Sequence, residues 1–279
     1  MKRYAVIGHP VGHSLSPLMQ NTAFRSLGID AQYEMIDIAP HDLEQKLHEF
    51  RGPAWGGFNI TSPHKSSVLP YLDGISQEAE AAQAVNAVCN MSGLLVGANT
   101  DILGFRQSLD PFLGDIVGNP CTLLGSGGAA AAVLFILITY IKPQHINLIA
   151  RTRETAEALL ERFHPSAIPI NLMNFAESNL QTIIKQSSII INSTTAGMLP
   201  RHQETPLPGI HFHKDQIVYD LIYRPRNTCL LQQAKSDGAQ TIGGLEMFIH
   251  QGAAAFQLWT GKQMPIPKIR QVLEEALSS

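Results

Sequence analysis

Residues 121–130 read CTLLGSGGAA, and this stretch decides the fold. An apolar run that can form a buried strand leads into GSGGAA, which matches the G-x-G-x-x-A form of the dinucleotide-binding fingerprint, and the apolar segment 129–141 follows as a buried helix. In this motif Gly125 permits a tight turn, Gly127 lets the backbone approach a pyrophosphate, and Ala130 allows the helix to pack closely on the strand. The glycines alone would also fit an ordinary helix-entry turn, but their place between a strand and a helix favours a nucleotide site at the helix N-terminus.

The choice of nucleotide depends on the second strand of this unit, residues 146–149, which is followed by ARTRE. An enzyme that binds NAD usually places Asp or Glu here to bind the ribose 2′-hydroxyl, whereas this chain has Arg151 and Arg153. Guanidinium groups can bind a 2′-phosphate through paired hydrogen bonds, so the sequence favours NADP. The same residues also fit an ordinary helix start, with Thr152 as N-cap and Glu154 in the first turn.

Short β-rich runs alternate with helical patterns along the chain, which is typical of an α/β fold. We expect strands at residues 4–7, 32–38, 55–60, 85–89, 94–98, 122–124, 146–149, 188–191, 217–221 and 241–242. Two late apolar-periodic segments, 245–259 and 269–277, predict helices, and their pattern does not assign them to a domain.

The order of these elements predicts two α/β domains. From Thr122 onward it is that of a dinucleotide-binding sheet, so residues 102–244 are expected to form a Rossmann-type NADP-binding domain. Residues 1–101 are expected to form an N-terminal substrate-binding domain, with the boundary in a tight connection after Asp101 and a ligand cleft between the domains.

Composition and charge exclude several classes of protein. The formal net charge is -3 and no Lys/Arg-rich run occurs, so nucleic acid is not an expected partner. The longest apolar stretch is shorter than the ~18 residues of a spanning helix, and the N-terminus lacks a signal-peptide pattern. Cys89, Cys121 and Cys229 are far apart, which predicts neither a disulfide framework nor a metal site. We expect a cytoplasmic monomer or homodimer that binds a small molecule and no membrane.

Three polar clusters lie at strand ends in the first domain. The first holds Ser14 and Ser16 before a proline, at a helix start that could bind a carboxylate, although Ser16 would also fit an N-cap. The second is FNITSPHK at 58–65, and the third combines VN at 85–86 with GANTD at 97–101. A Lys and an Asp from these clusters can form a charged pair, because both are ionised at neutral pH. As isolated residues, each would more commonly be a solvated surface charge.

Seven motifs carry a resemblance to a known family: SLSP, NITSPHK, ANTD, GSGGAA, ARTR, NSTTAGM and GGLEMFIHQGAAAF. Their order and spacing closely resemble those of the shikimate dehydrogenases over nearly the whole chain. The resemblance implies a reversible, NADPH-dependent reduction of 3-dehydroshikimate to shikimate, a step toward chorismate and the aromatic amino acids. It also implies that the C-terminal helices, about residues 245–279, return to the substrate-binding domain.

The resemblance assigns Lys65 and Asp101 to catalysis, with Lys65 donating a hydrogen bond or a proton to the substrate carbonyl oxygen, and it leaves open which of the two exchanges the proton. The substrate-binding residues that it implies are Ser14, Ser16 and Tyr223 at the carboxylate, and Thr61, Asn86 and Gln251 at the ring hydroxyls. The cofactor-binding residues that it implies are Gly125, Ser126, Gly127, Gly128, Ala129, Arg151, Thr152, Arg153, Thr194, Met198, Leu221 and Gly244. No metal is implied.

The sequence departs from the family pattern at three places. Ala150 stands for a common Asn, which removes an amide near the adenosine and would weaken the preference for NADP; Gln20 stands for a frequent His, and Ser62 for an apolar residue. A quinate/shikimate dehydrogenase that uses NAD and a non-catalytic NADP-binding sensor domain are the alternatives. The two arginines after residue 150 argue against the first, and the intact lysine and aspartate argue against the second. A methylene-tetrahydrofolate dehydrogenase has a comparable plan, but SLSP and Gln251 do not suit a folate site.

Overall fold

A computed structural model describes residues 1–12 and 14–278. The chain folds into two compact units. The first unit comprises Met1–Gly104 together with the segment from Ile249 onward, and the second comprises Phe105–Phe248. Each unit has its own six-stranded sheet, and the predicted α/β class with two α/β units is confirmed.

Both passages between the units fall inside helices, α5 (Thr100–Leu109) and α11 (Leu245–Thr260). The chain therefore continues as a helix through Asp101, where the sequence suggested a tight connection. Within the described residues, the longest apolar segments form helices that are too short or too polar to cross a membrane.

The sheet of the first unit has the strand order β2-β1-β3-β5-β6-β4. β1 pairs in parallel with β2 and β3, whereas β5 pairs antiparallel with β3 and β6. The strands are β1 (Lys2–Gly8), β2 (Ala31–Asp37), β3 (Trp55–Ile60), β4 (Gly74–Ile75), β5 (Ala87–Met91) and β6 (Leu94–Ala98).

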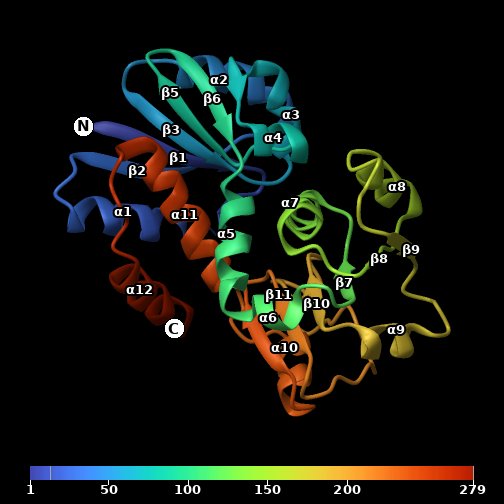
Figure 1. Ribbon diagram of the computed structural model, residues 1–279. Helices are drawn as coiled ribbons and strands as arrows, with labels where there is room; N and C mark the ends of the chain where they lie inside the picture. Colours follow the sequence, from blue (N-terminus) through green and yellow to red (C-terminus); the bar gives the residue numbers. More distant parts are fainter. Residues whose placement is uncertain (13, 279) are drawn as a thin grey trace. The chain divides into compact units, whose positions relative to one another are not determined.

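Helices cover both faces of this sheet (Figure 1), because side chains alternate between the faces along each strand. On one face Ala5 and Ile7 pack with Leu47 of α2 in a buried apolar cluster. On the other face Tyr4 contacts Phe24 of α1, with ring centroids 5.2 Å apart. The helices and short turns are α1 (Ser16–Ser26), α2 (Leu43–Phe50), α3 (His64–Ser67), α4 (Gln77–Ala82), α12 (Ile266–Ser278) and the 3-10 turns Pro40–Asp42 and Leu69–Tyr71.

The sheet of the second unit is wholly parallel and has the order β12-β11-β10-β7-β8-β9. In chain order, β7, β8 and β9 run from the centre of the sheet to one edge, and β10, β11 and β12 run from the centre to the other edge. The direction of progress therefore reverses between β7 and β10. In doubly wound sheets a ligand binds at the carboxyl ends of the strands beside this reversal. The strands are β7 (Cys121–Leu124), β8 (Ile146–Ile149), β9 (Ile170–Met173), β10 (Ile189–Asn192), β11 (Ile217–Asp220) and β12 (Gln240–Gly243).

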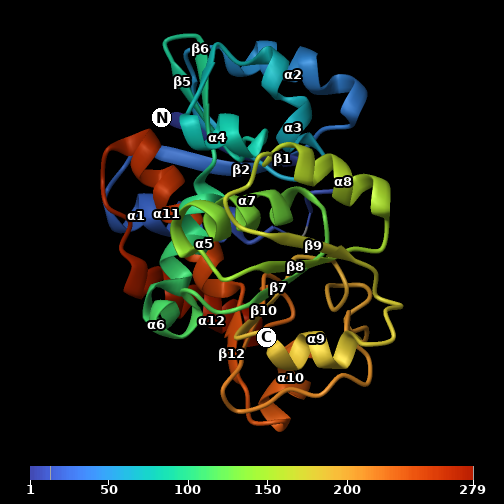
Figure 2. The same cartoon turned by 45° about the vertical axis from the view of Figure 1, so that its right-hand side comes forward.

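Helices α7 and α8 lie on one side of the second sheet and α9 and α10 on the other (Figures 1 and 2). Ile184 of α9 and Leu230 of α10 pack with Leu124 and Ile190 of the sheet. On the opposite face Tyr219 stacks on a ring of α5 with centroids 5.3 Å apart. The helical segments are α6 (Leu113–Ile116), α7 (Gly128–Ile136), a π-helical turn (Leu137–Ile141), α8 (Arg153–Glu161), α9 (Leu180–Gln186), α10 (Cys229–Ser236) and the 3-10 turn Asp110–Phe112.

Every strand predicted from the sequence is present, with ends that shift by at most a few residues. Two strands were missed. β4 has only 2 residues, too few to show an alternating pattern, and β9 is a partly exposed edge strand that follows a polar, proline-containing stretch.

Candidate active site

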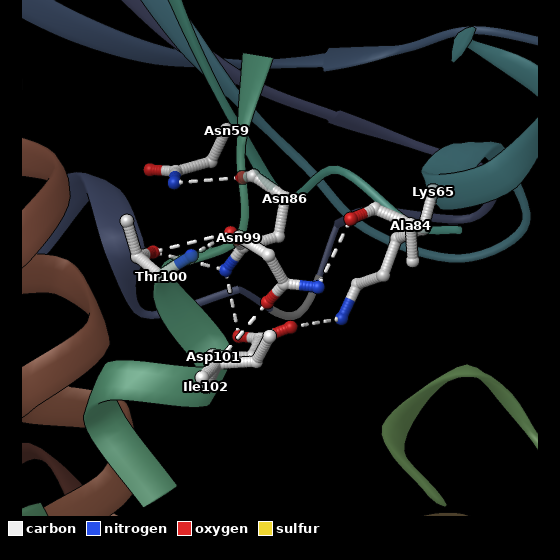
Figure 3. Close-up of polar contacts among 8 residues, drawn as sticks. All are labelled: Asn59, Lys65, Ala84, Asn86, Asn99, Thr100, Asp101 and Ile102. Carbon is white, nitrogen blue, oxygen red and sulfur yellow. Dashed lines mark hydrogen bonds and ion pairs between the residues drawn. The ribbon is translucent and has the colours of Figure 1, made fainter. Parts of the chain in front are cut away.

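A lysine and an aspartate form an ion pair in the first unit (Figure 3). Lys65 lies in α3, directly after the turn that ends β3, and Asp101 lies in the first turn of α5. Lys65 Nζ donates to Asp101 Oδ2 over 2.7 Å. The two side chains are 24% and 13% exposed, so the pair is less screened by water than a surface pair and the amine is still accessible.

The Asp101 carboxylate is held from its other side as well. Asn86 Nδ2 donates to Asp101 Oδ1 over 2.7 Å, and Asn86 Oδ1 accepts the Thr100 N–H over 2.6 Å (Figure 3). Asn99 caps α5, because its Oδ1 accepts a backbone N–H three residues along the helix over 3.3 Å. Because both carboxylate oxygens accept a hydrogen bond, the orientation of the carboxylate toward the lysine is fixed.

Ser14 lies in the loop between β1 and α1, and Ser16 lies at the start of α1. Ser16 is the first residue of α1, and Leu15 occupies the N-cap position without a side-chain cap bond, so the alternative reading of Ser16 as the N-cap is wrong. Instead, Ser14 Oγ accepts the Ser16 N–H over 3.2 Å. The loop is fixed at Val11, whose N–H donates to Asp37 Oδ2 over 3.2 Å and whose carbonyl accepts the Ser14 N–H over 3.1 Å.

The turn after β3 lies against this serine loop. Thr61 places its methyl group where a side chain on Gly8 would otherwise lie, so only glycine fits there. The His9 N–H donates to the Ser62 carbonyl over 3.0 Å. The loop that carries Ser14 and the turn that leads to the ion-paired lysine are therefore neighbours in one unit.

Gln251 lies half-buried on α11. The carbonyl of the next residue, Gly252, accepts Gln20 Nε2 over 3.0 Å, which ties α11 to α1. A side chain on Gly252 would displace the end of the buried Met19 side chain, which fills the space beside it. The position of Gln251 thus depends on close packing between these two helices.

In the second unit, β7 leads into the glycine turn at the carboxyl edge of the sheet. Gly125 has φ +101°, and a Cβ there would lie 2.9 Å from Ser193 Oγ and 3.0 Å from Thr194 Cγ2. In contrast, a Cβ on Gly127 or Gly128 would meet nothing within 4 Å. Since α7 begins at Gly128, there is open space beside its first turn, and a helix N-terminus with such a cradle can bind the phosphates of a dinucleotide.

The residues after β8 lie near the start of α8. Arg151 is exposed, and Arg153 pairs with a glutamate one turn along α8, with Nε and Oε1 2.8 Å apart. Thr152 occupies the N-cap position of α8 without a side-chain cap bond. Ser126 Oγ lies 2.9 Å from a threonine hydroxyl of α8, which joins the glycine turn to this helix, while Ala129 is half-buried in the first turn of α7.

The loop after β10 starts from a buried amide. Asn192 Oδ1 accepts both the Thr194 N–H over 3.0 Å and the Thr194 hydroxyl over 2.7 Å. Met198, farther along the loop, is 43% exposed. On the neighbouring strand, burial raises the pKa of the Asp220 carboxyl to about 6.

Two backbone segments approach closely after β11 and β12. A side chain on Gly244 would collide with the carbonyl of Leu221, so this contact requires glycine. Tyr223 stacks on Phe248 with ring centroids 4.4 Å apart.

Comparisons with known proteins agree with this arrangement. Residues 6–88 match the family model described as the shikimate dehydrogenase substrate binding domain, and residues 244–274 match that of the shikimate 5′-dehydrogenase C-terminal domain. A shikimate dehydrogenase (NADP(+)) of Moorella thermoacetica is 39% identical over 276 residues, which are 99% of this chain and 93% of that protein. This chain belongs to the shikimate dehydrogenase family.

Solved structures of this and related families share the fold. The shikimate 5-dehydrogenase of Thermus thermophilus in complex with NADP(H) and shikimate is 36% identical, covers 99% of this chain and 100% of its own, and has a TM-score of 0.86. The quinate dehydrogenase of Corynebacterium glutamicum in complex with NAD is 28% identical, covers 98% and 99%, and has a TM-score of 0.89.

In this member of the shikimate dehydrogenase family, a buried polar chain that the sequence motifs did not predict supports Asn86. Asn59 Nδ2 donates to the Asn86 carbonyl over 3.0 Å (Figure 3), and the Tyr33 hydroxyl donates to Asn59 Oδ1 over 2.7 Å. Burial raises the pKa of Tyr33 well above its usual value, so the hydroxyl stays a neutral donor. The only signal in the sequence was Asn59, because an amide inside an apolar strand needs partners once it is buried.

Proposed function

We propose that this chain catalyses the reversible, NADPH-dependent reduction of 3-dehydroshikimate to shikimate. The observation that carries the proposal is the half-buried Lys65–Asp101 pair, with its 2.7 Å contact, in a chain of this family. A cationic donor fixed by a carboxylate and accessible to a ligand is the device that a carbonyl reduction needs. A sensor domain without turnover would not need this pair.

The chemical role assigned to the chain is hydrogen bonding and proton transfer at the carbonyl oxygen of the substrate. When bound, NADPH supplies the hydride for the carbonyl carbon. Lys65 Nζ donates a hydrogen bond to the carbonyl oxygen, where negative charge develops as the carbonyl becomes an alcohol. The proton that completes the alcohol comes from the Lys65–Asp101 pair, and the pair takes it back in the reverse direction. Asp101 keeps its orientation because Asn86 holds the second carboxylate oxygen.

The remaining side chains of the first unit are assigned to substrate recognition. Ser14 and Ser16 are small hydroxyl donors near the start of α1, which suits a carboxylate. Thr61, Asn86 and Gln251 offer hydroxyl and amide groups that can match the ring hydroxyls of the substrate. An analogue that lacks one of those hydroxyls would leave a buried polar group unpaired and would bind less well.

The second unit is assigned to NADP. The open cradle at Gly127 and Gly128 supports pyrophosphate binding at α7. The exposed Arg151 is available to a 2′-phosphate, and Arg153 can reach it by exchanging its surface pair, which is a weak interaction. We assign the protein to the cytoplasm, because its cysteines are free thiols.

The proposal is tested with Lys65→Ala, beside Lys46→Ala as a matched control. Lys46 forms an exposed pair with a glutamate on α2, so its removal should leave turnover unchanged. For Lys65→Ala we expect kcat to fall by about a hundredfold or more, with the Kd of NADPH unchanged in a fluorescence titration. Turnover of 3-dehydroshikimate at the wild-type rate by Lys65→Ala would contradict the assignment, and Asp101→Asn, which keeps the side-chain volume, provides an independent check.

A further inference from the structure

We propose that Asp220 is a positioning residue for the nucleotide, because its acceptor-only carboxylate sets the direction of the hydrogen bonds that shape the loop after β10. The inference rests on the proposed binding of NADP to the second unit. Asp220 is the last residue of β11 and lies in register with Asn192, the last residue of β10, at the carboxyl edge of the sheet. This edge also holds the glycine turn after β7.

The carboxylate is completely buried and accepts three hydrogen bonds. Asn192 Nδ2 and the Ile222 N–H donate to Oδ1 over 3.0 Å and 3.1 Å, and the Thr228 hydroxyl donates to Oδ2 over 2.7 Å. Thr228 is the N-cap of α10, and its oxygen accepts the Leu231 N–H. A single side chain therefore connects the ends of β10 and β11 with the start of α10.

The direction of these bonds continues into the loop. An ionised carboxylate can only accept, so Asn192 must present its amide nitrogen to Asp220 and its oxygen to the other side. There the oxygen accepts the Thr194 N–H and hydroxyl, and Thr194 Oγ1 in turn accepts the Ala196 N–H over 3.2 Å. If Asp220 were neutral, its group could also donate, and the amide of Asn192 would no longer be confined to one orientation.

This loop contacts the glycine turn. Ser193 Oγ donates to the Leu124 carbonyl over 2.6 Å. Ser193 and Thr194 are also the residues that leave no room for a side chain on Gly125. Asp220 therefore fixes the orientation of Asn192, and Asn192 fixes the two residues, Ser193 and Thr194, that contact the turn before α7.

The orientation of Asn192 should depend on pH, because it requires an ionised Asp220. The groups that hydrogen-bond to the carboxylate are a hydroxyl, an amide and a backbone N–H, none of which titrates near neutrality. Burial raises its pKa to about 6, against the hydrogen bonds from Thr228, Ile222 and Asn192, which lower it. We therefore expect the loop to be held most firmly above about pH 6 and to loosen below it.

The test compares wild type, Asp220→Asn and the control Asp237→Asn in fluorescence titrations with NADPH and NADH at about pH 5.5 and about pH 7.5. Both nucleotides are needed, because a 2′-phosphate itself titrates near pH 6 and NADH has none. Asp237 accepts the Phe212 N–H over 2.9 Å but comes before β12, at the amino end of that strand. Its variant should leave nucleotide binding unchanged.

We expect Asp220→Asn to raise the Kd of both nucleotides by about tenfold at the higher pH, the size of a coupling between neighbouring hydrogen-bonded groups. Wild type should approach the variant's Kd for NADH at the lower pH, whereas the variant's Kd for NADH should not change with pH. The effects of Asp220→Asn and Thr194→Val on the Kd of NADH should be less than additive, because both substitutions act on the same chain of hydrogen bonds.

Wild-type affinity in Asp220→Asn at the higher pH, or the same pH dependence in both proteins with NADH, would overturn the inference. If the variant fails to fold, the pH dependence of NADH binding by wild type and by Thr194→Val decides it, and a flat wild-type profile overturns it. Failure of wild type to bind either nucleotide would overturn the proposed function instead, so the two failures are distinguishable.

Discussion

The buried Asp220 carboxyl should make the second unit less stable at neutral pH than at acidic pH. Its pKa rises from 3.8 to about 6 on folding, so the folded state binds the proton more tightly than the unfolded state. The resulting stability is present below about pH 4 and is lost as the pH rises through about 6. The shift corresponds to on the order of 3 kcal/mol of unfolding free energy at neutral pH.

Asp220→Asn should therefore stabilise this unit most at high pH. The amide is neutral at every pH and keeps an oxygen that can accept from Asn192 and Ile222. We expect the unfolding free energy of the variant minus that of wild type to increase by about 2 kcal/mol between about pH 4.5 and about pH 7.5, because the rest of the effect develops below about pH 4.5. The variant would then be more stable and bind nucleotide less well, a trade-off common at functional sites.

Hydrogen exchange of the β10 and β11 amides is the suitable assay, because both tryptophans, Trp55 and Trp259, belong to the first unit. Comparing variant and wild type at the same pH cancels the intrinsic exchange rate. Asp237→Asn should give the opposite sign, since a backbone N–H lowers the pKa of Asp237 and its contribution is lost as the pH falls. An Asp220→Asn difference that is equal at both pH values would refute the reasoning.

Three further substitutions probe other parts of the account. Arg151→Ala should weaken NADP by about tenfold more than NAD in binding titrations, as loss of a charge-assisted hydrogen bond predicts; equal effects on both nucleotides would argue against a 2′-phosphate site. Gly125→Ala should destabilise the second unit by about 1–3 kcal/mol, because φ is +101° and the Cβ has no room, and unchanged hydrogen exchange would count against this. Tyr33→Phe should lower the unfolding free energy by about 1–3 kcal/mol in tryptophan-monitored urea unfolding, whereas Tyr4→Phe, on the neighbouring strand, should have a smaller effect.

Most of the fold follows from local patterns. Three strands show this: β7 is marked by the glycine turn that follows it, and β8 and β11 by the apolar runs at 146–149 and 217–221. In each case the signal comes from residues that are near one another in the sequence. β9 was missed because its side chains are partly exposed at a sheet edge. The sequence placed the boundary after Asp101, and the two units divide after Gly104, inside α5, because a helix pattern does not show where its packing partners change.

The ion-paired residues of the candidate site could be predicted from the sequence, but the buried residues that hold them and the neighbouring loops in place could not. Lys65 and Asp101 lie in motifs, and their pairing at 2.7 Å accords with opposite charges at strand ends. Tyr33 and Asp220, in contrast, act through partners that the fold brings to them. A buried polar residue in a strand shows that a partner is needed, but tertiary packing decides which one it finds.

The most direct test of the central claim is initial-rate kinetics on the purified protein, with shikimate or quinate against NADP or NAD in all four combinations. The account predicts a dominant rate with shikimate and NADP. Comparable rates with quinate or NAD would contradict the assigned specificity and point to Ala150, where the family commonly has an amide. Tight NADP binding without turnover in any combination would contradict the catalytic role of the Lys65–Asp101 pair.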